Sequence, residues 1–153
     1  MGDEGTMRFG QGDIWDSLNE VDAICVTTNG IIKADGKLVM GAGIAKQARD
    51  RFPGIDFYAG GEVLRSGSHV RTIFQDRMTR IVSLPTKQHW RDPSPFWLVD
   101  RSLTELVVLV NKMGWETILL TRPGCGHGGL DWETQVKPLC EKILDERFCV
   151  VAP

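Results

Sequence analysis

The stretch at residues 122–132, RPGCGHGGLDW, has the composition of a phosphate-binding loop. Its glycines fall at positions 124, 126, 128 and 129, after an apolar run at 117–121 and before Asp131, a favourable helix N-cap. Glycine lets the backbone adopt positive φ and approach a ligand closely, and N–H groups at a helix start favour an anion. The pattern therefore predicts a phosphate site, although glycine-rich turns also serve as plain connections between strand and helix.

A second glycine-rich segment, GAGIA, lies at residues 41–45. It leads into residues 43–52, where apolar side chains recur at helical spacing. Two loops of this kind can face each other across one crevice, which favours a ligand site over a purely structural role.

The composition is that of one globular domain. The chain has 153 residues, of which 42% are apolar and 25% charged, so we expect a single domain over residues 1–153. The net charge of −2 gives no long-range attraction to nucleic acid, and any such contact depends on a local patch. No apolar run approaches the roughly 18 residues of a membrane span. The sequence leaves the oligomeric state open, with a monomer expected.

The four cysteines form no C-x-x-C pair, and no histidine stands at zinc spacing, so neither a metal nor a cofactor is expected. Cys25, Cys140 and Cys149 lie in apolar segments and are predicted to be small core residues. For Cys125, in the glycine loop, close packing is favoured over a nucleophilic role because no base is adjacent in sequence. The N-terminus lacks the features of a secretory signal, so we expect a cytoplasmic protein.

The elements that position these loops alternate between strands and helices. The predicted strands are residues 6–9, 21–28, 60–64, 70–75, 80–84, 115–121 and 148–151. The predicted helices are residues 43–52, 96–112 and 132–144, with a short helical piece after the turn at 10–15. Residues 31–39 form an insertion that can fold back as a hairpin about Asp35 and Gly36. This order predicts an α/β fold with a mixed, mostly parallel sheet covered on both faces.

Sheets of this kind bind ligands where loops leave the carboxyl ends of the strands. Asn29, Gly41, Lys87 and Gly124 each lie in a segment that follows a predicted strand or leads out of one. We therefore expect them at one edge of the sheet.

Four segments, taken in order, resemble a macrodomain. They are QGDI at residues 11–14, the strand ending in Asn29, MGAGIAKQ at 40–47 followed by RFP, and PGCGHGGLDW at 123–132. The resemblance covers essentially the whole chain. It implies a three-layer α/β/α fold that binds ADP-ribose.

The resemblance also implies a role for each segment. The Asp13 carboxylate would accept a hydrogen bond from the adenine amino group, Asn29 and the loop at 41–45 would hold the distal ribose, and residues 124–130 would wrap the diphosphate. By sequence alone, a helix N-cap is the favoured interpretation of Asp13, and Asn29 is also explained as a turn residue that tolerates positive φ. His127 is expected to be a loop side chain over the diphosphate, with an acid role as the alternative. The implied ligand-binding residues are Asp13, Ile14, Asn29, Gly41, Gly43, Ile44, Ala45, Gly124, Cys125, Gly126, His127, Gly128, Gly129 and Leu130.

The segment LPTKQHWR at residues 84–91 resembles the one that carries the catalytic lysine in one macrodomain subgroup. That subgroup includes the terminal ADP-ribose protein glycohydrolase and the antitoxin macrodomains that remove ADP-ribose from DNA. The loop form GCGxGGLDW is closer to the antitoxins. The protein glycohydrolase carries a catalytic aspartate in this loop, at the position that is Gly128 here.

Lys87 is thus the predicted catalytic residue. Burial beside Trp90 and Leu84 would lower the pKa of its amine from a reference value near 10.4 and free it to attack the anomeric carbon. A charged Lys87 would instead stabilise the departing group, and the remaining alternative is a solvated lysine. Residues 87–91 also offer a local contact for DNA, because a tryptophan can stack on a flipped base. The alternative, equally open from the sequence, is that Trp90 covers the edge of the core.

The function expected from this resemblance is an ADP-ribosyl glycohydrolase that acts on a modified macromolecule, either a DNA base or an acidic protein side chain. Two alternatives stay open. One is a phosphatase for ADP-ribose 1″-phosphate, and the other is a non-catalytic module that reads ADP-ribose.

Overall fold

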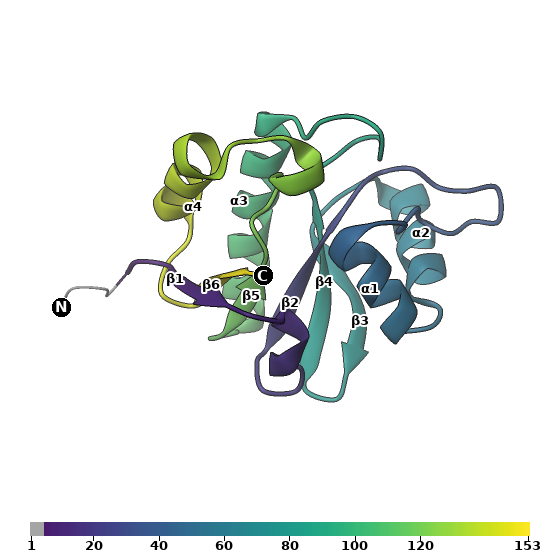
Figure 1. The fold of residues 1–153 in the computed structure, drawn as a ribbon. Coiled ribbons are helices and arrows are strands. Elements are labelled where there is room, and N and C mark those ends of the chain that lie inside the picture. Colours follow the sequence, from purple (N-terminus) through teal and green to yellow (C-terminus); the bar gives the residue numbers. More distant parts are fainter. Residues whose placement is uncertain (1–4) are drawn as a thin grey trace.

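The computed structural model describes residues 5–153, and their elements form one sheet with helices on both faces (Figure 1). The strands are β1 (Arg8–Gln11), β2 (Ala23–Thr28), β3 (Arg71–Asp76), β4 (Thr79–Pro85), β5 (Ile118–Leu120) and β6 (Phe148–Ala152). The α-helices are α1 (Gly43–Arg51), α2 (Ile55–Ser66), α3 (Phe96–Met113) and α4 (Lys137–Ile143). Short helical turns are η1 (Ile14–Ser17), η2 (Gly126–Gly128) and the π-helical turn η3 (Trp132–Val136).

The sheet has the strand order β1-β6-β5-β2-β4-β3. Every neighbouring pair is parallel except β3 and β4, which form the predicted antiparallel hairpin at one edge. The predicted α/β class with a mixed, mostly parallel sheet is therefore confirmed. Strand β1 lies two residues later than expected, β5 is shorter, and the last helix begins with the turn η3.

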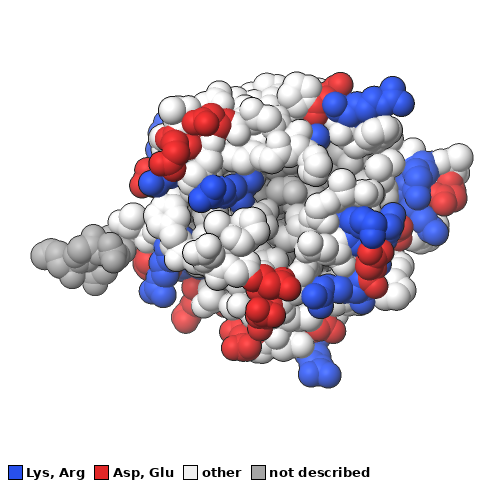
Figure 2. Space-filling view, in the orientation of Figure 1, with Lys and Arg blue, Asp and Glu red and all other residues white. Residues whose placement is uncertain are grey.

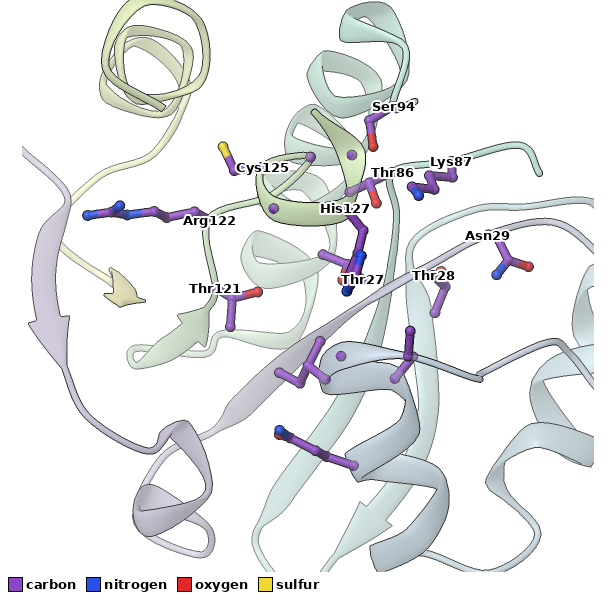
Figure 3. A pocket seen from close by; sticks show the side chains of 18 of the residues that line it. Thr27, Thr28, Asn29, Thr86, Lys87, Ser94, Thr121, Arg122, Cys125 and His127 are labelled. Carbon is purple, nitrogen blue, oxygen red and sulfur yellow. The ribbon is translucent and has the colours of Figure 1, made fainter. Parts of the chain in front are cut away.

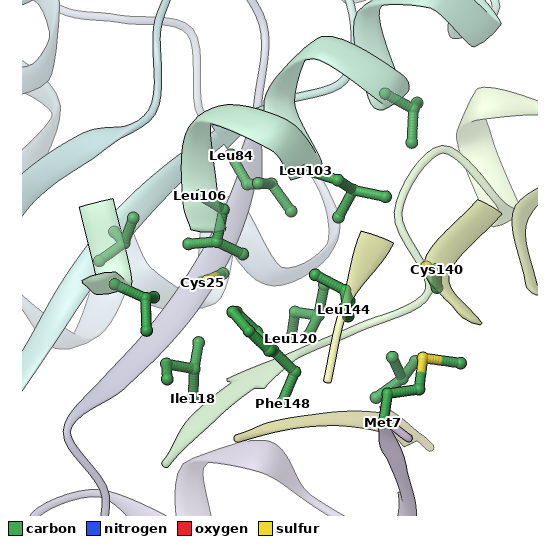
Figure 4. Packing of buried hydrophobic residues seen from close by; sticks show 14 of the residues in the cluster. Met7, Cys25, Leu84, Leu103, Leu106, Ile118, Leu120, Cys140, Leu144 and Phe148 are labelled. Carbon is green, nitrogen blue, oxygen red and sulfur yellow. The ribbon is translucent and has the colours of Figure 1, made fainter. Parts of the chain in front are cut away.

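Side chains of β2 alternate between two hydrophobic cores because successive residues of a strand point to opposite faces. Ala23 and Cys25 pack in the core beneath α3 and α4, whereas Ile24 and Val26 pack in the core beneath α1 and α2. Figure 4 shows Leu103 of α3 facing the first of these cores. All four of these β2 side chains are at most 1% exposed, so this part of β2, a central strand of the sheet, is covered on both faces.

Residues 31–39 form the predicted hairpin. Ile32 and Leu38 are bridged in antiparallel fashion, and the backbone N–H of Leu38 donates to the carbonyl of Asp56 in α2 at 2.9 Å. Leu38 is 1% exposed. The insertion therefore packs against α2 and is tied to it through the backbone.

The prediction of a strand at residues 60–64 is wrong, because this segment lies inside α2. Two adjacent glycines lower the intrinsic helix propensity there, and tertiary packing overrides it. A Cβ atom at Gly60 would lie 2.0 Å from the carbonyl oxygen of Gly36, so the hairpin approaches the helix as closely as the absence of a side chain permits. Ile55 and Ala59 on the same helix are buried, which stabilises it through the core.

Among the described residues no helix is both long enough and apolar enough to cross a membrane.

We predict opposite effects for the two glycines of α2. Gly60→Ala should destabilise the fold by about 1–3 kcal/mol, because the added methyl meets backbone that cannot yield. Gly61→Ala is the matched control: a Cβ there meets nothing within 4 Å, and the gain in helix propensity should stabilise by up to about 1 kcal/mol. Chemical denaturation of both variants measures the difference, and equal stabilities would refute the contact with the hairpin.

Candidate functional site

A cleft of about 1560 Å³ opens where β1, β2, β4 and β5 end. In Figure 2 the cleft is the hollow in the middle of the molecular surface, and the floor of this hollow consists mostly of atoms from uncharged residues. It is lined by residues around Asp13, Asn29, Gly43, Lys87 and Gly126, each from a different loop. The predicted gathering of these segments at one edge of the sheet is confirmed.

The start of α1 presents free backbone donors to this cleft. Ala42 is the N-cap and makes no capping hydrogen bond with its side chain. The first N–H to bond back is that of Lys46, to the carbonyl of Ala42 at 3.2 Å, so within residues 5–153 the N–H groups of Gly43, Ile44 and Ala45 have no backbone acceptor. Three unsatisfied donors at a helix start attract an anion.

The glycine-rich loop at residues 124–130 faces α1 across the cleft (Figure 3). Gly124 and Gly126 have φ of 78° and 63°, the left-handed region that the predicted tight turn requires. The N–H groups of Gly126 and His127 donate to no backbone acceptor in the described part of the chain. Like the start of α1, this loop therefore offers main-chain donors to an anion.

Two residues of this loop do not line the cleft, contrary to the expectation that residues 124–130 act together. Gly129, with φ of 78°, turns the chain away from it. The N–H of Leu130 donates to the carbonyl of Gly124 at 3.0 Å, and its side chain packs against the core. Leu130 therefore stabilises the closed conformation of the loop from its core-facing side.

Asp13 lies at one end of the cleft and is exposed. One carboxylate oxygen accepts a hydrogen bond from the N–H of Trp15 at 3.0 Å, so Asp13 is the N-cap of η1. Neighbouring Ile14 is 6% exposed and lines the same end. Asp13 therefore has the helix-capping role that its sequence position indicates. The cap uses one carboxylate oxygen and leaves the other for a ligand.

Asn29 lines the cleft, and its side-chain amide spans the base of the hairpin at residues 31–39. The amide nitrogen donates to the carbonyl of Val39 and the amide oxygen accepts from the N–H of Ile31, both at 3.0 Å. Asn29 thus joins the two ends of the hairpin at the cleft edge, which turn chemistry alone does not predict.

Lys87 follows β4 at the other end of the cleft. Its ammonium group donates to the carbonyl of Trp90 at 3.2 Å. The apolar enclosure expected around Lys87 is incomplete: Leu84 is fully buried, but Trp90 is 46% exposed and Lys87 itself is partly buried. Its side chain is therefore held by a backbone carbonyl at the rim of the cleft.

We compared the sequence and the structure of this chain with those of known proteins to identify its family. No protein-family model matches the chain. It resembles the macrodomain of Mycobacterium tuberculosis DarG with a TM-score of 0.75 and 27% identity, over 97% of this chain and 99% of that one. The macrodomain of Thermus aquaticus DarG gives the same TM-score and coverage at 28% identity. The chain belongs to the macrodomain family.

The curated relatives of this macrodomain are longer proteins. The DNA ADP-ribosyl glycohydrolase of Mycobacterium tuberculosis is 31% identical over 134 residues, which are 83% of this chain and 36% of that protein. The protein of the same name from Thermus aquaticus is 31% identical over 146 residues, 91% of this chain and 38% of that protein. This macrodomain therefore spans little more than a third of the relatives that it matches.

The cysteines of this macrodomain are free thiols. Cys25 and Cys140 are fully buried as predicted, and burial raises the pKa of the Cys140 thiol to about 12. Cys149 is only partly buried, because β6 neighbours the edge strand β1. Burial likewise raises the pKa of the Cys125 thiol, so the neutral form dominates at pH 7, which favours packing over nucleophilic attack.

Several polar residues of the macrodomain cleft escaped the sequence analysis. Most lie at strand ends or before a helix and two lie within α1, and only the fold brings their side chains to the cleft. They are Thr27, Thr28, Gln47, Arg51, Thr86, Ser94 and Thr121. No group of three or more His, Cys, Asp or Glu residues in the described chain is placed to hold a metal ion.

Asn29 should matter for the stability of the hairpin as well as for the cleft. Asn29→Ala removes both bonds to the hairpin ends and should lower the free energy of unfolding by about 1–3 kcal/mol. Asn29→Asp keeps the acceptor for Ile31 but sets a carboxylate against the carbonyl of Val39. Hydrogen exchange should show lost protection at residues 31–39 in both variants. Protection unchanged from the wild type would contradict the clamp.

Proposed function

We propose that this macrodomain binds ADP-ribose and hydrolyses the glycosidic bond that joins it to a modified DNA base. The observation that carries the proposal is the order of groups that the strand order sets along one cleft. The Asp13 carboxylate follows β1, two sets of free backbone N–H groups follow the intervening strands β5 and β2, and the Lys87 amine follows β4. This order matches an adenine, a diphosphate and a distal ribose. The names of the curated relatives support DNA as the modified substrate.

Backbone donors suit this ligand because the protein carries a net charge of −2. Phosphate oxygens accept from N–H groups in the loop around Gly126 and also at the start of α1, a segment for which the resemblance implies a contact with the distal ribose. Four cationic side chains, those of Arg51, Lys87, Arg91 and Arg122, line the same cleft. The adenine amino group donates to the free oxygen of Asp13. The distal ribose then lies near Asn29 and Lys87.

Lys87 has two possible chemical roles in this reaction. As a nucleophile, its neutral amine forms a bond to the anomeric carbon while the bond to the base breaks, the base takes up a proton, and water later hydrolyses the lysine adduct to release ADP-ribose. As a fixed cation, it stabilises the negative charge on the departing base while water attacks. The hydrogen bond to Trp90 O holds the amine at the rim, where the substrate enters.

The segment after Lys87 supports a local contact with DNA. The indole of Trp90 is 46% exposed, with the ring of His89 5.3 Å away and the Arg91 guanidinium 4.9 Å from its centre. An exposed aromatic ring beside a cation is a stacking surface for a base next to the modified one.

Lys87→Ala should abolish turnover of thymidine-linked ADP-ribosylated DNA while leaving the affinity for ADP-ribose within a few-fold of the wild type. Lys142→Ala, an exposed lysine in the last turn of α4, is the control and should retain full activity. Lys87→Arg keeps the positive charge, but its guanidinium cannot act as a neutral amine. Activity in this variant would identify Lys87 as a fixed cation, whereas loss of activity would identify Lys87 as the nucleophile.

The same assay separates the alternatives. Tight binding without turnover by the wild type would identify a reader of ADP-ribose. Release of phosphate from ADP-ribose 1″-phosphate would identify the phosphatase. Absence of ADP-ribose binding in calorimetry would refute the proposal as a whole.

Asp13→Asn tests the adenine contact apart from the N-cap. Asparagine caps a helix as well as aspartate does, so stability should stay within about 0.5 kcal/mol of the wild type. The acceptor for the adenine amino group is weakened, and the affinities for ADP-ribose and AMP should both fall about 5–10-fold, whereas ribose 5-phosphate binding should not change. Unchanged affinity for AMP would leave Asp13 as a cap alone.

A further inference from the structure

Ser94 is a buried residue of the cleft with an unused hydroxyl. It precedes α3 and is 5% exposed, yet it lines the cleft. Its hydroxyl oxygen has no hydrogen-bond partner within the described residues. Burial of a hydroxyl without a hydrogen-bond partner is energetically unfavourable, so the presence of a serine at this position needs an explanation.

Only two other buried side-chain atoms among residues 5–153 lack a partner, the hydroxyl of Ser68 and Nε of Arg101. Neither of these residues lines the cleft. Ser94 is therefore the one place in the described chain where an unsatisfied buried donor and the proposed ligand site coincide.

The fold reserves space for this hydroxyl. A Cβ atom at Gly128 would lie 2.4 Å from the Ser94 hydroxyl oxygen and 3.0 Å from its Cβ. Gly128, unlike Gly126 and Gly129, does not have positive φ, so backbone conformation does not require glycine there. The requirement is steric: Gly128 leaves room for the Ser94 side chain.

A backbone hydrogen bond fixes Ser94 to the glycine-rich loop independently of its hydroxyl. The N–H of Ser94 donates to the carbonyl of Gly128 at 2.8 Å. The position of the loop is thus held by the main chain, and the hydroxyl is left free for another partner. Figure 3 shows the hydroxyl of Ser94 on the side of the loop that faces Thr86 and Lys87.

We propose that the Ser94 hydroxyl donates a hydrogen bond to the phosphate next to the distal ribose and so positions that ribose for Lys87. This inference rests on the proposed function. The hydroxyl lies between the loop whose N–H groups face the diphosphate and the lysine at the ribose end. A phosphate oxygen only accepts hydrogen bonds, and the serine hydroxyl is a group that can donate one.

Ser94→Ala removes the hydroxyl and keeps the backbone bond to Gly128. The affinity for ADP-ribose and for ADP should fall about 10–100-fold, which is the usual weight of one hydrogen bond to a charged group. AMP lacks the second phosphate, so its affinity should change less than about twofold by the same argument. Calorimetry with the three ligands measures this pattern.

Stability separates this role from a structural one. Loss of a buried, unpartnered hydroxyl should leave the thermal midpoint of Ser94→Ala unchanged or raised, whereas a structural serine would lower it. Affinities for ADP-ribose and AMP that both stay within twofold of the wild type would overturn the inference, as would an equal loss for both.

Exchange of the two positions is the second test. Gly128→Ala alone should collide with Ser94 and weaken ADP-ribose binding. Ser94→Gly with Gly128→Ser relieves the collision and returns a hydroxyl from the other side, so it should bind ADP-ribose more tightly than Ser94→Gly with Gly128→Ala. Equal affinities of the two double variants would count against the inference. Wild-type binding without turnover would refute the glycohydrolase but leave the Ser94 comparison intact.

Discussion

The parallel pairing of β2 with β4 is the constraint on which the cleft depends. The register runs from Ala23 opposite Arg80 to Thr28 opposite Pro85, so both strands end at the same level. Beyond that level the pairing continues, because the N–H groups of Thr86 and Lys87 both donate to the carbonyl of Thr28. Asn29 and Lys87, far apart in sequence, are thereby fixed on neighbouring strand ends. Their relative position does not depend on a flexible loop. The pairing of the two strands already offsets the loss of conformational entropy that ordering these residues requires.

The main chain supplies many of the hydrogen-bond donors of the cleft. Two segments rich in glycine, one at the start of α1 and one around Gly126, leave their N–H groups without acceptors. Unsatisfied donors are costly in a closed core, but here they border an open cleft where water or an anion serves them. In a protein with a net charge of −2, these main-chain donors act together with the four cationic side chains that line the cleft, those of Arg51, Lys87, Arg91 and Arg122.

Two close approaches show how the fold uses glycines that are not needed for backbone conformation. At Gly60 the absent side chain admits the carbonyl of Gly36 and lets the hairpin pack on α2. At Gly128 it admits the side chain of Ser94 beside the glycine-rich loop. In both places the partner is far away in sequence, so the reason for the glycine is a contact and not a turn.

The sequence by itself determined the α/β class, the helices at α1 and α3, the hairpin of β3 and β4, and the loops that meet at the cleft, because periodicity, turn residues and caps are local signals. It did not determine α2, where adjacent glycines argue against a helix and burial of Ile55 and Ala59 overrides them. It also did not reveal that Asn29 clamps the hairpin, that Lys87 is only partly buried, or that Ser94 lies in the cleft. Those facts depend on distances between segments remote in the chain, and only the tertiary structure sets such distances.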